Sequence, residues 1–258
     1  MAFEINTDLD LALRLAKAAD METTARFRSA NLHVETKPDL TPVSDADTAA
    51  EQSMLDLLAV ERPDDAILAE ESGPSGDSAR TWILDPIDGT KQFVRGLPSW
   101  ATLVALREND DTLVAVVSAP ALGRLWWAAK GQGAWTDGGK AIAVSGVTTL
   151  SESVLLHAEL SGWDDVPGGP AKLVDLSREC WQSRGYGDFW IHCLVAEGAA
   201  EIAAEPGPSL WDLAAPALIV EEAGGRFTSL DGRDGPTHGS ALATNGHLHD
   251  TVLSVLNS

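Results

Sequence analysis

The sequence predicts a mixed α/β fold built as two halves that pack closely against each other. Three observations support this fold class. Segments with helical spacing of apolar residues alternate with short runs typical of strands. The 258 residues contain neither a long linker nor an internal repeat. The residue pattern changes after Ser145 and Gly146, so we expect an N-terminal half at 1–145 and a C-terminal half at 146–258.

Two helices are expected to open the N-terminal half. Apolar residues recur at helical spacing over 7–27, and Thr7 with Asp10 resembles a capping box at the start of that helix. A second helix is expected to follow, with Asp45 or Asp47 as its cap. Both caps rest on the same chemistry, because oxygen-bearing side chains accept hydrogen bonds from the free N–H groups of a first helical turn.

Short apolar runs between turn residues predict the strands of a sheet in this half. The run at 82–84 is entirely apolar, as expected of a strand buried on both faces, and it ends at an acidic loop. The glycines and proline at 73–76 predict a loop. The other expected strands of this half are 31–34, 66–69, 101–107, 112–118, 125–128 and 133–136.

The C-terminal half continues the alternation of strands and helices. A helix at 213–222 is expected to end at Gly224 and Gly225, and Pro216, about one turn into it, removes one backbone hydrogen bond. A loop is expected at 185–188. The remaining expected elements are strands at 154–156, 226–228 and 241–243, and helices at 171–180, 194–204 and 248–256.

The charge balance excludes two classes of partner. With 39 acidic against 18 basic residues the net charge is −21, which argues against nucleic acid and against a basic membrane-surface helix. No apolar run approaches the ~20 residues of a membrane span, and the N-terminal segment lacks the basic start of a signal peptide. Cys180 and Cys193 form no CxxC pair and are expected to stay reduced, so a cytoplasmic protein is expected.

The strongest sign of chemistry is the acidic loop at 85–90, DPIDGT. It follows a buried strand, and strand ends are where α/β proteins place their sites. Because proline stiffens the turn, the carboxylates of Asp85 and Asp88 and the carbonyl of Ile87 can converge on one point. Oxygen ligands of this kind suit Mg²⁺, and Gly89 lets a ligand approach the backbone.

The residues after this loop suit a phosphate. Residues 91–93 can begin a short helix whose free N–H groups face the same point. Carboxylates for a metal beside a cradle for a phosphate predict a phosphatase, in which metal-activated water replaces a protein nucleophile. Serine hydrolysis has no support, because the sequence lacks a Gly-x-Ser-x-Gly elbow.

Three segments resemble one enzyme family. Residues 82–90, WILDPIDGT, resemble the signature of the inositol monophosphatase family. The pair Glu70-Glu71 resembles the acidic pair that this family carries upstream of the signature, and Trp211-Asp212 resembles its second signature. The segments stand in the family's order, so the sequence is identified as similar to this family.

The resemblance implies a layered αβαβα fold, commonly homodimeric, and a Mg²⁺-dependent, Li⁺-sensitive phosphomonoesterase that acts on a small-molecule phosphate. It implies that Glu70, Asp85 and the Ile87 carbonyl hold one Mg²⁺. A second Mg²⁺ would be held by Asp85, Asp88 and Asp212. A third, more loosely held ion would lie near Glu70.

The resemblance also implies how water and phosphate are held. Thr90 and Glu70 would orient the attacking water, with Asp47 paired to the Thr90 hydroxyl. Asp45 is a second candidate near the water, but its position in the family's pattern is less favourable than that of Asp47. The N–H groups of Gly89 and Thr90 would bind the phosphate, and Asp88 and Asp212 would also face the substrate.

The segment at 184–190, RGYGDFW, corresponds to the part of the family that abuts the leaving group. Asp188 stands where sugar-binding members more often carry small or hydroxylic residues, and Glu205 stands at a typical leaving-group contact. Two acids there predict a leaving group that carries a cation. Arg184 could orient these acids or touch the phosphate. Alternatively, Asp188 is a helix cap before Phe189.

This stretch resembles the branch of the family that acts on histidinol phosphate in histidine biosynthesis. That substrate carries an ammonium and an imidazole, with which Asp188 and Glu205 could pair and on which Trp190 or Trp135 could stack. Inositol 1-phosphate, fructose 1,6-bisphosphate and 3′-phosphoadenosine phosphate are the alternative substrates. A catalytically silent binding homologue is disfavoured, because it would have no chemical need for the full ligand set.

Five features are expected to lie outside the chemistry. Residues 131–133 predict a hairpin turn rather than a dinucleotide site. His192 is expected in or near the core, and His247 and His249 on an exposed terminal helix. Lys37 stands where family members often carry a basic residue near a mobile metal loop, but an ordinary surface lysine is expected.

Overall fold

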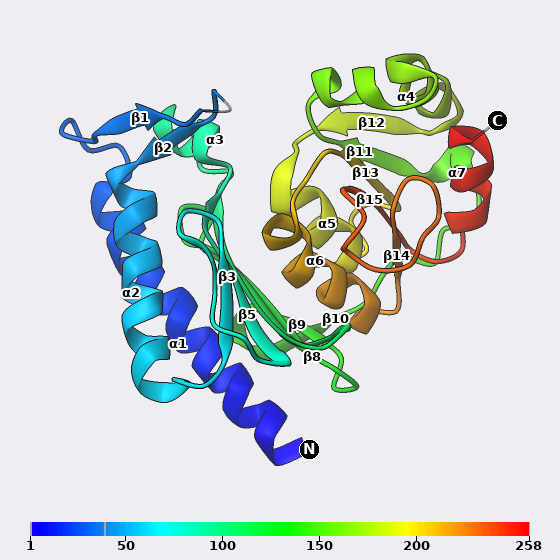
Figure 1. Ribbon diagram of the computed structural model, residues 1–258. Coiled ribbons are helices and arrows are strands. Elements are labelled where there is room, and N and C mark those ends of the chain that lie inside the picture. Colours follow the sequence, from blue (N-terminus) through cyan, green and yellow to red (C-terminus); the bar gives the residue numbers. More distant parts are fainter. Residues whose placement is uncertain (1, 39, 258) are drawn as a thin grey trace.

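The structure, a computed structural model, describes residues 2–38 and 40–257 and has five layers in which helices and sheets alternate (Figure 1). An eight-stranded sheet lies between the first and second pairs of helices, and a five-stranded sheet between the second and third pairs. The layered αβαβα fold implied by the resemblance is confirmed. The helix pairs are α1 (Ala2–Arg26) with α2 (Asp45–Glu61), α5 (Asp188–Ala196) with α6 (Leu210–Glu222), and α4 (Gly169–Glu179) with α7 (His249–Leu256).

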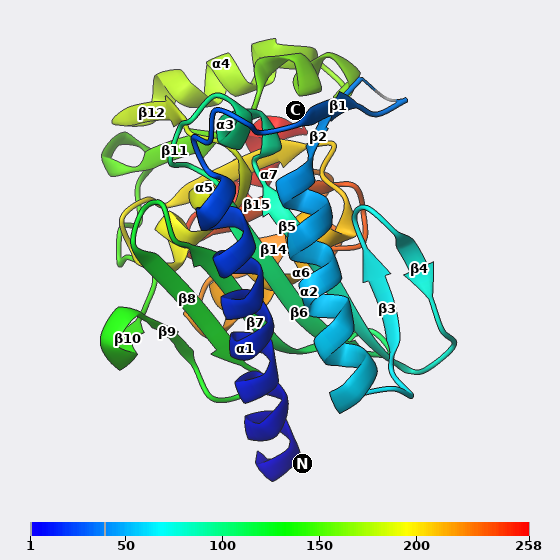
Figure 2. The same cartoon turned by 90° about the vertical axis from the view of Figure 1, so that its left-hand side faces the viewer.

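The larger sheet has the strand order β10-β9-β8-β7-β6-β5-β3-β4, with β3 and β5 parallel and the other neighbours antiparallel. Helices α1 and α2 lie across one face (Figure 2), and α6 packs on the other. Its central strands are therefore apolar on both sides, as the run at 82–84 predicted. The strands are β3 (Ala66–Ala69), β4 (Gly73–Ser75), β5 (Arg80–Asp88), β6 (Ala101–Glu108), β7 (Asp111–Ala119), β8 (Arg124–Ala129), β9 (Ala134–Thr136) and β10 (Lys140–Ile142).

The smaller sheet has the strand order β12-β11-β13-β15-β14, in which β11 is parallel to β12 and β13. A separate two-stranded hairpin and one short helix lie beside the larger sheet (Figure 1). Among the described helices, none is long and apolar enough to cross a membrane. The remaining elements are β1 (Val34–Thr36), β2 (Pro42–Ser44), α3 (Thr90–Val94), β11 (Val154–His157), β12 (Gln182–Gly185), β13 (Ile202–Pro206), β14 (Arg226–Thr228), β15 (Ser240–Thr244) and the 3-10 turns η1 (Asp137–Gly139), η2 (Leu150–Glu152) and η3 (Leu160–Asp165).

Helix α6 joins the two sheets into one core. Its fully buried Leu213 and Ile219 belong to a cluster that also contains Leu103 of β6 and Phe227 of β14. Pro216 lies inside α6, where the sequence placed it, and is buried. Burying apolar side chains of both sheets against one helix stabilises them as a unit, at roughly 25 cal/mol per Å² removed from water.

Helix α1 begins earlier than expected. It starts at Ala2, so Thr7 lies inside the helix and the capping box predicted from Thr7 and Asp10 is wrong. Ile5 is buried against the larger sheet's helix-covered face. The helix therefore gains apolar contact upstream of the expected start, which outweighs a local capping preference.

Ser44 is the N-cap residue of helix α2. The prediction that Asp45 or Asp47 caps this helix is therefore wrong. The Asp47 carboxylate accepts hydrogen bonds from the Ser44 N–H at 2.8 Å and from its hydroxyl at 2.6 Å. Asp47 is thus the third helical residue of a capping box whose hydroxyl member is Ser44.

A helix was expected at 194–204, but α5 ends at Ala196 and β13 follows at Ile202–Pro206. The chain turns at Gly198, between the end of α5 and the start of β13. Its φ of +73° suits glycine, and a Cβ there would lie 3.0 Å from the Ala143 carbonyl oxygen. An apolar run of this length does not distinguish a helix from a buried strand, so periodicity alone could not find the break.

The short strand β4 lies where a loop was expected, β12 lies in a stretch for which no strand was predicted, and β1 lies further along the chain than the predicted strand at 31–34. Both β4 and β12 are edge strands of their sheets. Edge strands are short and polar in natural proteins, so they lack the apolar alternation that marks central strands. The turn predicted at 131–133 is confirmed, since these residues connect β8 to β9.

Candidate active site

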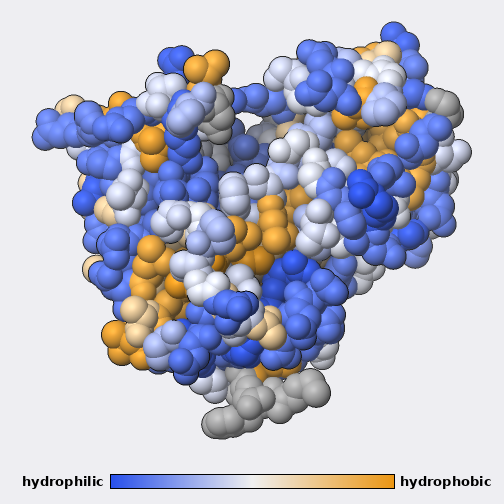
Figure 3. All heavy atoms as spheres, viewed as in Figure 1, coloured by the Kyte–Doolittle hydropathy of each residue, from blue (hydrophilic) through white to orange (hydrophobic). Residues whose placement is uncertain are grey.

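The predicted acidic loop lies in a cavity between the two halves, visible as a hollow on the upper side of the molecule (Figure 3). The cavity has a volume of about 790 Å³. Strand β5 ends at the cavity, α3 follows immediately, and the first turn of α6 also lines the cavity. Residues from both halves therefore line one cavity at the end of a buried strand.

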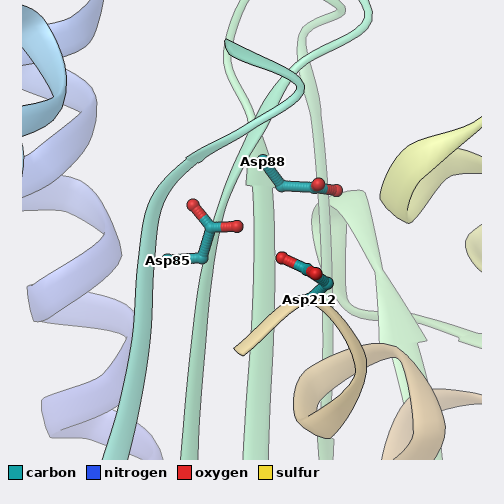
Figure 4. Close-up of side chains that lie close together, drawn as sticks. All are labelled: Asp85, Asp88 and Asp212. Atoms are coloured by element: carbon teal, nitrogen blue, oxygen red, sulfur yellow. The ribbon is translucent and has the colours of Figure 1, made fainter. Parts of the chain in front are cut away.

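Three carboxylates converge in this cavity. Asp85 and Asp88 come from the end of β5, where the register with β6 is interrupted between them, and Asp212 comes from the first turn of α6 (Figure 4). One oxygen of each carboxylate lies within 4.8 Å of the others. Asp212 is anchored by the Ser209 N–H, which donates to it at 2.6 Å. Side chains far apart in the sequence thus present oxygen atoms to one point.

The cluster carries uncompensated negative charge. Burial raises the pKa of Asp85 well above its usual value, and the nearby charge of Glu70 raises it further. Burial, followed by the charge of Asp188, raises the pKa of Asp88 in the same direction. The pKa of Asp212 is raised to about 7, chiefly by burial. Buried carboxylates that repel one another are stabilised by a cation, and an all-oxygen donor set suits a hard divalent metal. The residues therefore fit the metal that the resemblance implies.

Glu70 follows β3 at the rim of the cluster, where Lys37 reaches it. The Lys37 Nζ lies 2.9 Å from Glu70 Oε1 and 2.7 Å from Glu71 Oε1, and the lysine side chain is only 19% exposed. Burial alone would lower the pKa of Lys37, but the hydrogen bonds to Glu71 and Glu70 outweigh it and raise the pKa. The expectation of an ordinary surface lysine is wrong, because the β1–β2 hairpin folds Lys37 onto the acidic pair.

Thr90 and Asp47 lie side by side, as the resemblance implied. The Thr90 hydroxyl is 3.4 Å from Asp47 Oδ1, at the long end of hydrogen bonding, and 3.1 Å from the Ile87 carbonyl oxygen. Asp47 is fully buried, and burial raises its pKa to about 6. Asp45 points elsewhere: its side chain is 45% exposed and accepts a hydrogen bond from the His33 N–H. Of the two candidates, the structure brings only Asp47 to the threonine.

Gly89 allows the loop to turn into α3. Its φ is +88°, and a Cβ would lie 2.9 Å from the Ser99 carbonyl oxygen, so only glycine fits without displacing the backbone. Gly89 is the N-cap residue of α3, and both Gly89 and Thr90 line the cavity. The first N–H groups of a helix have no partner within it. The start of α3 and the carboxylates of Asp88 and Asp212 therefore line the same cavity.

Asp188 and Glu205 line the same cavity, and the charges of both raise the pKa of Asp88. Asp188 is the first residue of α5 and accepts a hydrogen bond from the Gln92 side-chain amide. The alternative of a capping Asp188 is wrong, because Gly187 is the N-cap residue and no side chain caps this helix. Burial, followed by the charge of Glu205, raises the pKa of Asp188 to about 7. Gln92 was not singled out, although its place two residues after Thr90 was a usable signal.

The predicted aromatic contacts and Arg184 are placed differently. Arg184 is exposed on β12 and donates to the Ser183 carbonyl oxygen. Trp135 lies on β9 and does not line the cavity. Trp190 also stays outside the lining but stacks on Tyr186, with ring centroids 5.2 Å apart and planes at 28°. Tyr186, which the sequence reasoning passed over, does line the cavity. Its place between two glycines just before Asp188 was the available signal.

Comparisons with known proteins agree with this geometry. Residues 5–258 match the model of the inositol monophosphatase family. A histidinol-phosphatase of Streptomyces coelicolor is 52% identical over 97% of both chains, and one of Mycobacterium tuberculosis is 54% identical over 97% of this chain and 98% of its own. The solved structure of an inositol monophosphatase from Anabaena superposes with a TM-score of 0.86 at 29% identity, covering 98% of this chain and 96% of the other. Because sequence match and fold agree over nearly the whole length, the chain belongs to the inositol monophosphatase family.

Proposed function

We propose that the protein is a Mg²⁺-dependent phosphomonoesterase that hydrolyses L-histidinol phosphate to L-histidinol and phosphate. The observation that carries this proposal is the pair of relatives named histidinol-phosphatase, at 52% and 54% identity over nearly the full length. Family membership supports the reaction class, a metal-dependent phosphoric monoester hydrolase. Histidinol phosphate is preferred to inositol 1-phosphate, because a relative named inositol-1-monophosphatase is only 33% identical.

The acid cluster is proposed to hold the metal. Glu70, Asp85 and the Ile87 carbonyl would hold one Mg²⁺, and Asp85, Asp88 and Asp212 a second, which agrees with the convergence of three of these carboxylates. When bound, such ions neutralise the phosphate and activate water. Glu70 would also border a third, more loosely held ion.

The remaining residues of the loop are proposed to orient the reactants. The Thr90 hydroxyl, supported by the neighbouring Asp47 carboxylate, would with Glu70 orient the attacking water. The N–H groups of Gly89 and Thr90 would hold the phosphate oxygens at the start of α3. Such placement replaces the random encounter of water and ester with a fixed geometry.

Asp188 and Glu205 are proposed to select the leaving group. Histidinol carries an ammonium and an imidazole, and Asp188 and Glu205 offer carboxylates that can accept hydrogen bonds from the ammonium and from the imidazole N–H. An uncharged cyclitol would leave both acids without a positive partner, at a cost in binding free energy. The exposed Tyr186 ring, backed by Trp190, offers a flat surface for the imidazole.

Phosphate release from a panel of substrates tests this assignment. With Mg²⁺ present, kcat/KM for histidinol phosphate should exceed that for inositol 1-phosphate, fructose 1,6-bisphosphate and 3′-phosphoadenosine phosphate. A higher value for inositol 1-phosphate would overturn the substrate. Removing metal with a chelator should abolish turnover, and Mg²⁺ should restore it better than Ca²⁺, because Mg²⁺ demands a tighter and more regular geometry.

We also propose a homodimer, on family resemblance, and a cytoplasmic location, on the biosynthetic role of the named relatives. Both described cysteines are free, as expected in a reducing compartment. Sedimentation velocity at micromolar protein should give a single species of twice the chain mass. Fractionation of cells should find the protein in the same fraction as other biosynthetic enzymes.

A further inference from the structure

A buried histidine lies directly beneath the leaving-group side of the cavity. His192 is 1% exposed, and its Nε2 lies 3.2 Å from Glu205 Oε2. His192 is four residues after Asp188 on α5, so the helix directs both side chains toward the same side. Its burial confirms the expectation of a core histidine, but its contact connects that core to the cavity.

The surroundings of the His192 ring indicate which of its two nitrogens carries the proton. Nδ1 of His192 is buried and has no hydrogen-bond partner among the residues that the structure describes. A proton on Nδ1 would bury an unpaired donor, whereas a proton on Nε2 points at an oxygen that can only accept. The Nε2–H of His192 therefore donates to Glu205. Phe227 packs against the imidazole with ring centroids 5.6 Å apart and limits its rotation.

Glu205 requires such a donor because its surroundings repel it. Its charge raises the pKa of Asp88, Asp188 and Asp212, so Glu205 lies among other carboxylates. A glutamate has three side-chain torsions, so an unsupported carboxylate would turn away from the cluster toward solvent. A fixed N–H on the inner side opposes that movement.

We propose that His192 is a positioning residue, which holds the Glu205 carboxylate toward the cationic leaving group and so sets the selectivity of the enzyme. This inference rests on the proposed function, since it takes Glu205 as a contact of the substrate's cation. His192 itself touches neither the substrate nor the reacting atoms. Its effect should therefore appear in substrate binding rather than in the chemical step.

Two variants separate the donor from the bulk of the side chain. His192→Met keeps the volume and removes the donor, whereas His192→Gln keeps an N–H near the place of Nε2. With His192→Met, KM for histidinol phosphate should rise about tenfold, the size of one lost hydrogen bond to a charged group. The kcat for that substrate, and both constants for glycerol 2-phosphate, should change less than about twofold. With His192→Gln, most of the loss should be recovered.

A double-mutant cycle with Glu205→Gln identifies the route of the effect. If His192 acts through Glu205, adding His192→Met to Glu205→Gln should raise KM no further. Additive losses, or an equal loss on both substrates, would overturn the inference. Should His192→Met fail to unfold cooperatively on heating, His192→Asn, whose amide is too short to reach Glu205, takes its place with the same expected result.

The substrate preference of the wild-type enzyme shows whether a failed test concerns the role of His192 alone or also the proposed function. A wild-type preference for glycerol 2-phosphate or inositol 1-phosphate would overturn both. A wild-type preference for histidinol phosphate that His192→Met leaves unchanged would overturn only the role of His192.

Discussion

Asp88 belongs to the acid cluster with Asp85 and Asp212, and the charges of Asp188 and Glu205 also act on it. Asp88→Asn should lower kcat at least about 100-fold, because it removes a charged oxygen from the proposed metal site. The fold should survive, since an amide oxygen can still accept the Phe189 N–H, which donates to Asp88 at 2.6 Å. Phosphate release and thermal unfolding measure the two effects.

The matched control is Asp77→Asn, the same chemical change at an exposed aspartate. It should alter neither activity nor unfolding temperature appreciably, because exposed polar substitutions contribute little. Activity retained in Asp88→Asn would contradict the assignment of this carboxylate to the metal.

His249 corrects an expectation and makes the stability depend on pH. It was predicted on an exposed helix, but it is fully buried, with one ring nitrogen 3.0 Å from the Thr228 hydroxyl and the other 2.9 Å from that of Thr244. Burial, aided by Arg226, lowers its pKa from 6.5 to about 4. Between these values the unfolded chain binds the proton and the folded chain does not, so the free energy of unfolding falls as the pH drops from 6.5 toward 4.

Urea unfolding at pH 7 and pH 5 measures this dependence. His249→Gln, which keeps hydrogen-bonding groups but does not titrate, should lose less stability than the wild type between the two pH values. His247→Gln is the control, because His247 is exposed in the same segment. An equal pH dependence in the wild type and His249→Gln would show that other groups account for the acid instability.

The residues of the candidate site differ in how far the sequence could place them. Asp85, Asp88 and Thr90 lie within six consecutive residues at the end of β5 and the start of α3, so local spacing already brings them together. Lys37 approaches Glu70 only because the β1–β2 hairpin folds over the end of β3, a contact between residues 33 positions apart. Such contacts depend on tertiary packing, which residue types at local spacing do not encode.

At the scale of elements, Gly89 controls the direction in which α3 leaves the acidic loop. Gly89→Ala should cost about 1–2 kcal/mol for its positive φ, and the added Cβ would also press on the Ser99 carbonyl at 2.9 Å. Since α3 carries Thr90, the displacement should lower kcat/KM more than tenfold. Activity assays and urea unfolding give the two quantities.

Gly123→Ala is the matched control for this substitution. Its φ is +65°, but a Cβ there meets nothing within 4 Å. It should therefore lose a similar stability for the left-handed backbone while keeping full activity. If Gly123→Ala impaired turnover as strongly as Gly89→Ala, the close approach at the loop could not be the cause.

The elements that the sequence predicted well are those with strong local patterns. Strand β3 lies at the predicted residues, and the central strands β6 and β7 differ from prediction only at their ends. The expected helix at 194–204 failed because it spans the end of α5 and the start of β13, both apolar and buried. The correction matters for function, because it places Glu205 on a strand of the smaller sheet, where His192 of α5 can reach it.

At the scale of the whole molecule, the two halves depend on each other for a core. Helix α6 of the C-terminal half covers a face of the larger sheet, and one buried cluster contains residues of both halves. We therefore propose that the halves at 1–145 and 146–258 are parts of one cooperative unit rather than independent domains. Separately expressed, the first half would expose the apolar sheet face that α6 covers.

The proposed metal site strengthens this coupling, because it draws Asp85 and Asp88 from one half and Asp212 from the other. Urea unfolding should give one transition, seen alike by circular dichroism and by tryptophan fluorescence, with buried reporters such as Trp82 in the first half and Trp163 in the second. The proposed Mg²⁺ site exists only where both halves are folded, so Mg²⁺ should raise the midpoint of that transition by linkage.

Asp88→Asn should remove most of this Mg²⁺-dependent rise, while Asp77→Asn should keep it. Two separated transitions, with Mg²⁺ shifting only one of them, would contradict the shared core. A rise that persisted in Asp88→Asn would instead place the stabilising ion elsewhere on a surface whose net charge of −21 attracts cations in general. Repeating the titration in 0.3 M NaCl separates these cases, because salt screens an exposed acidic surface far more than a buried cluster of carboxylates.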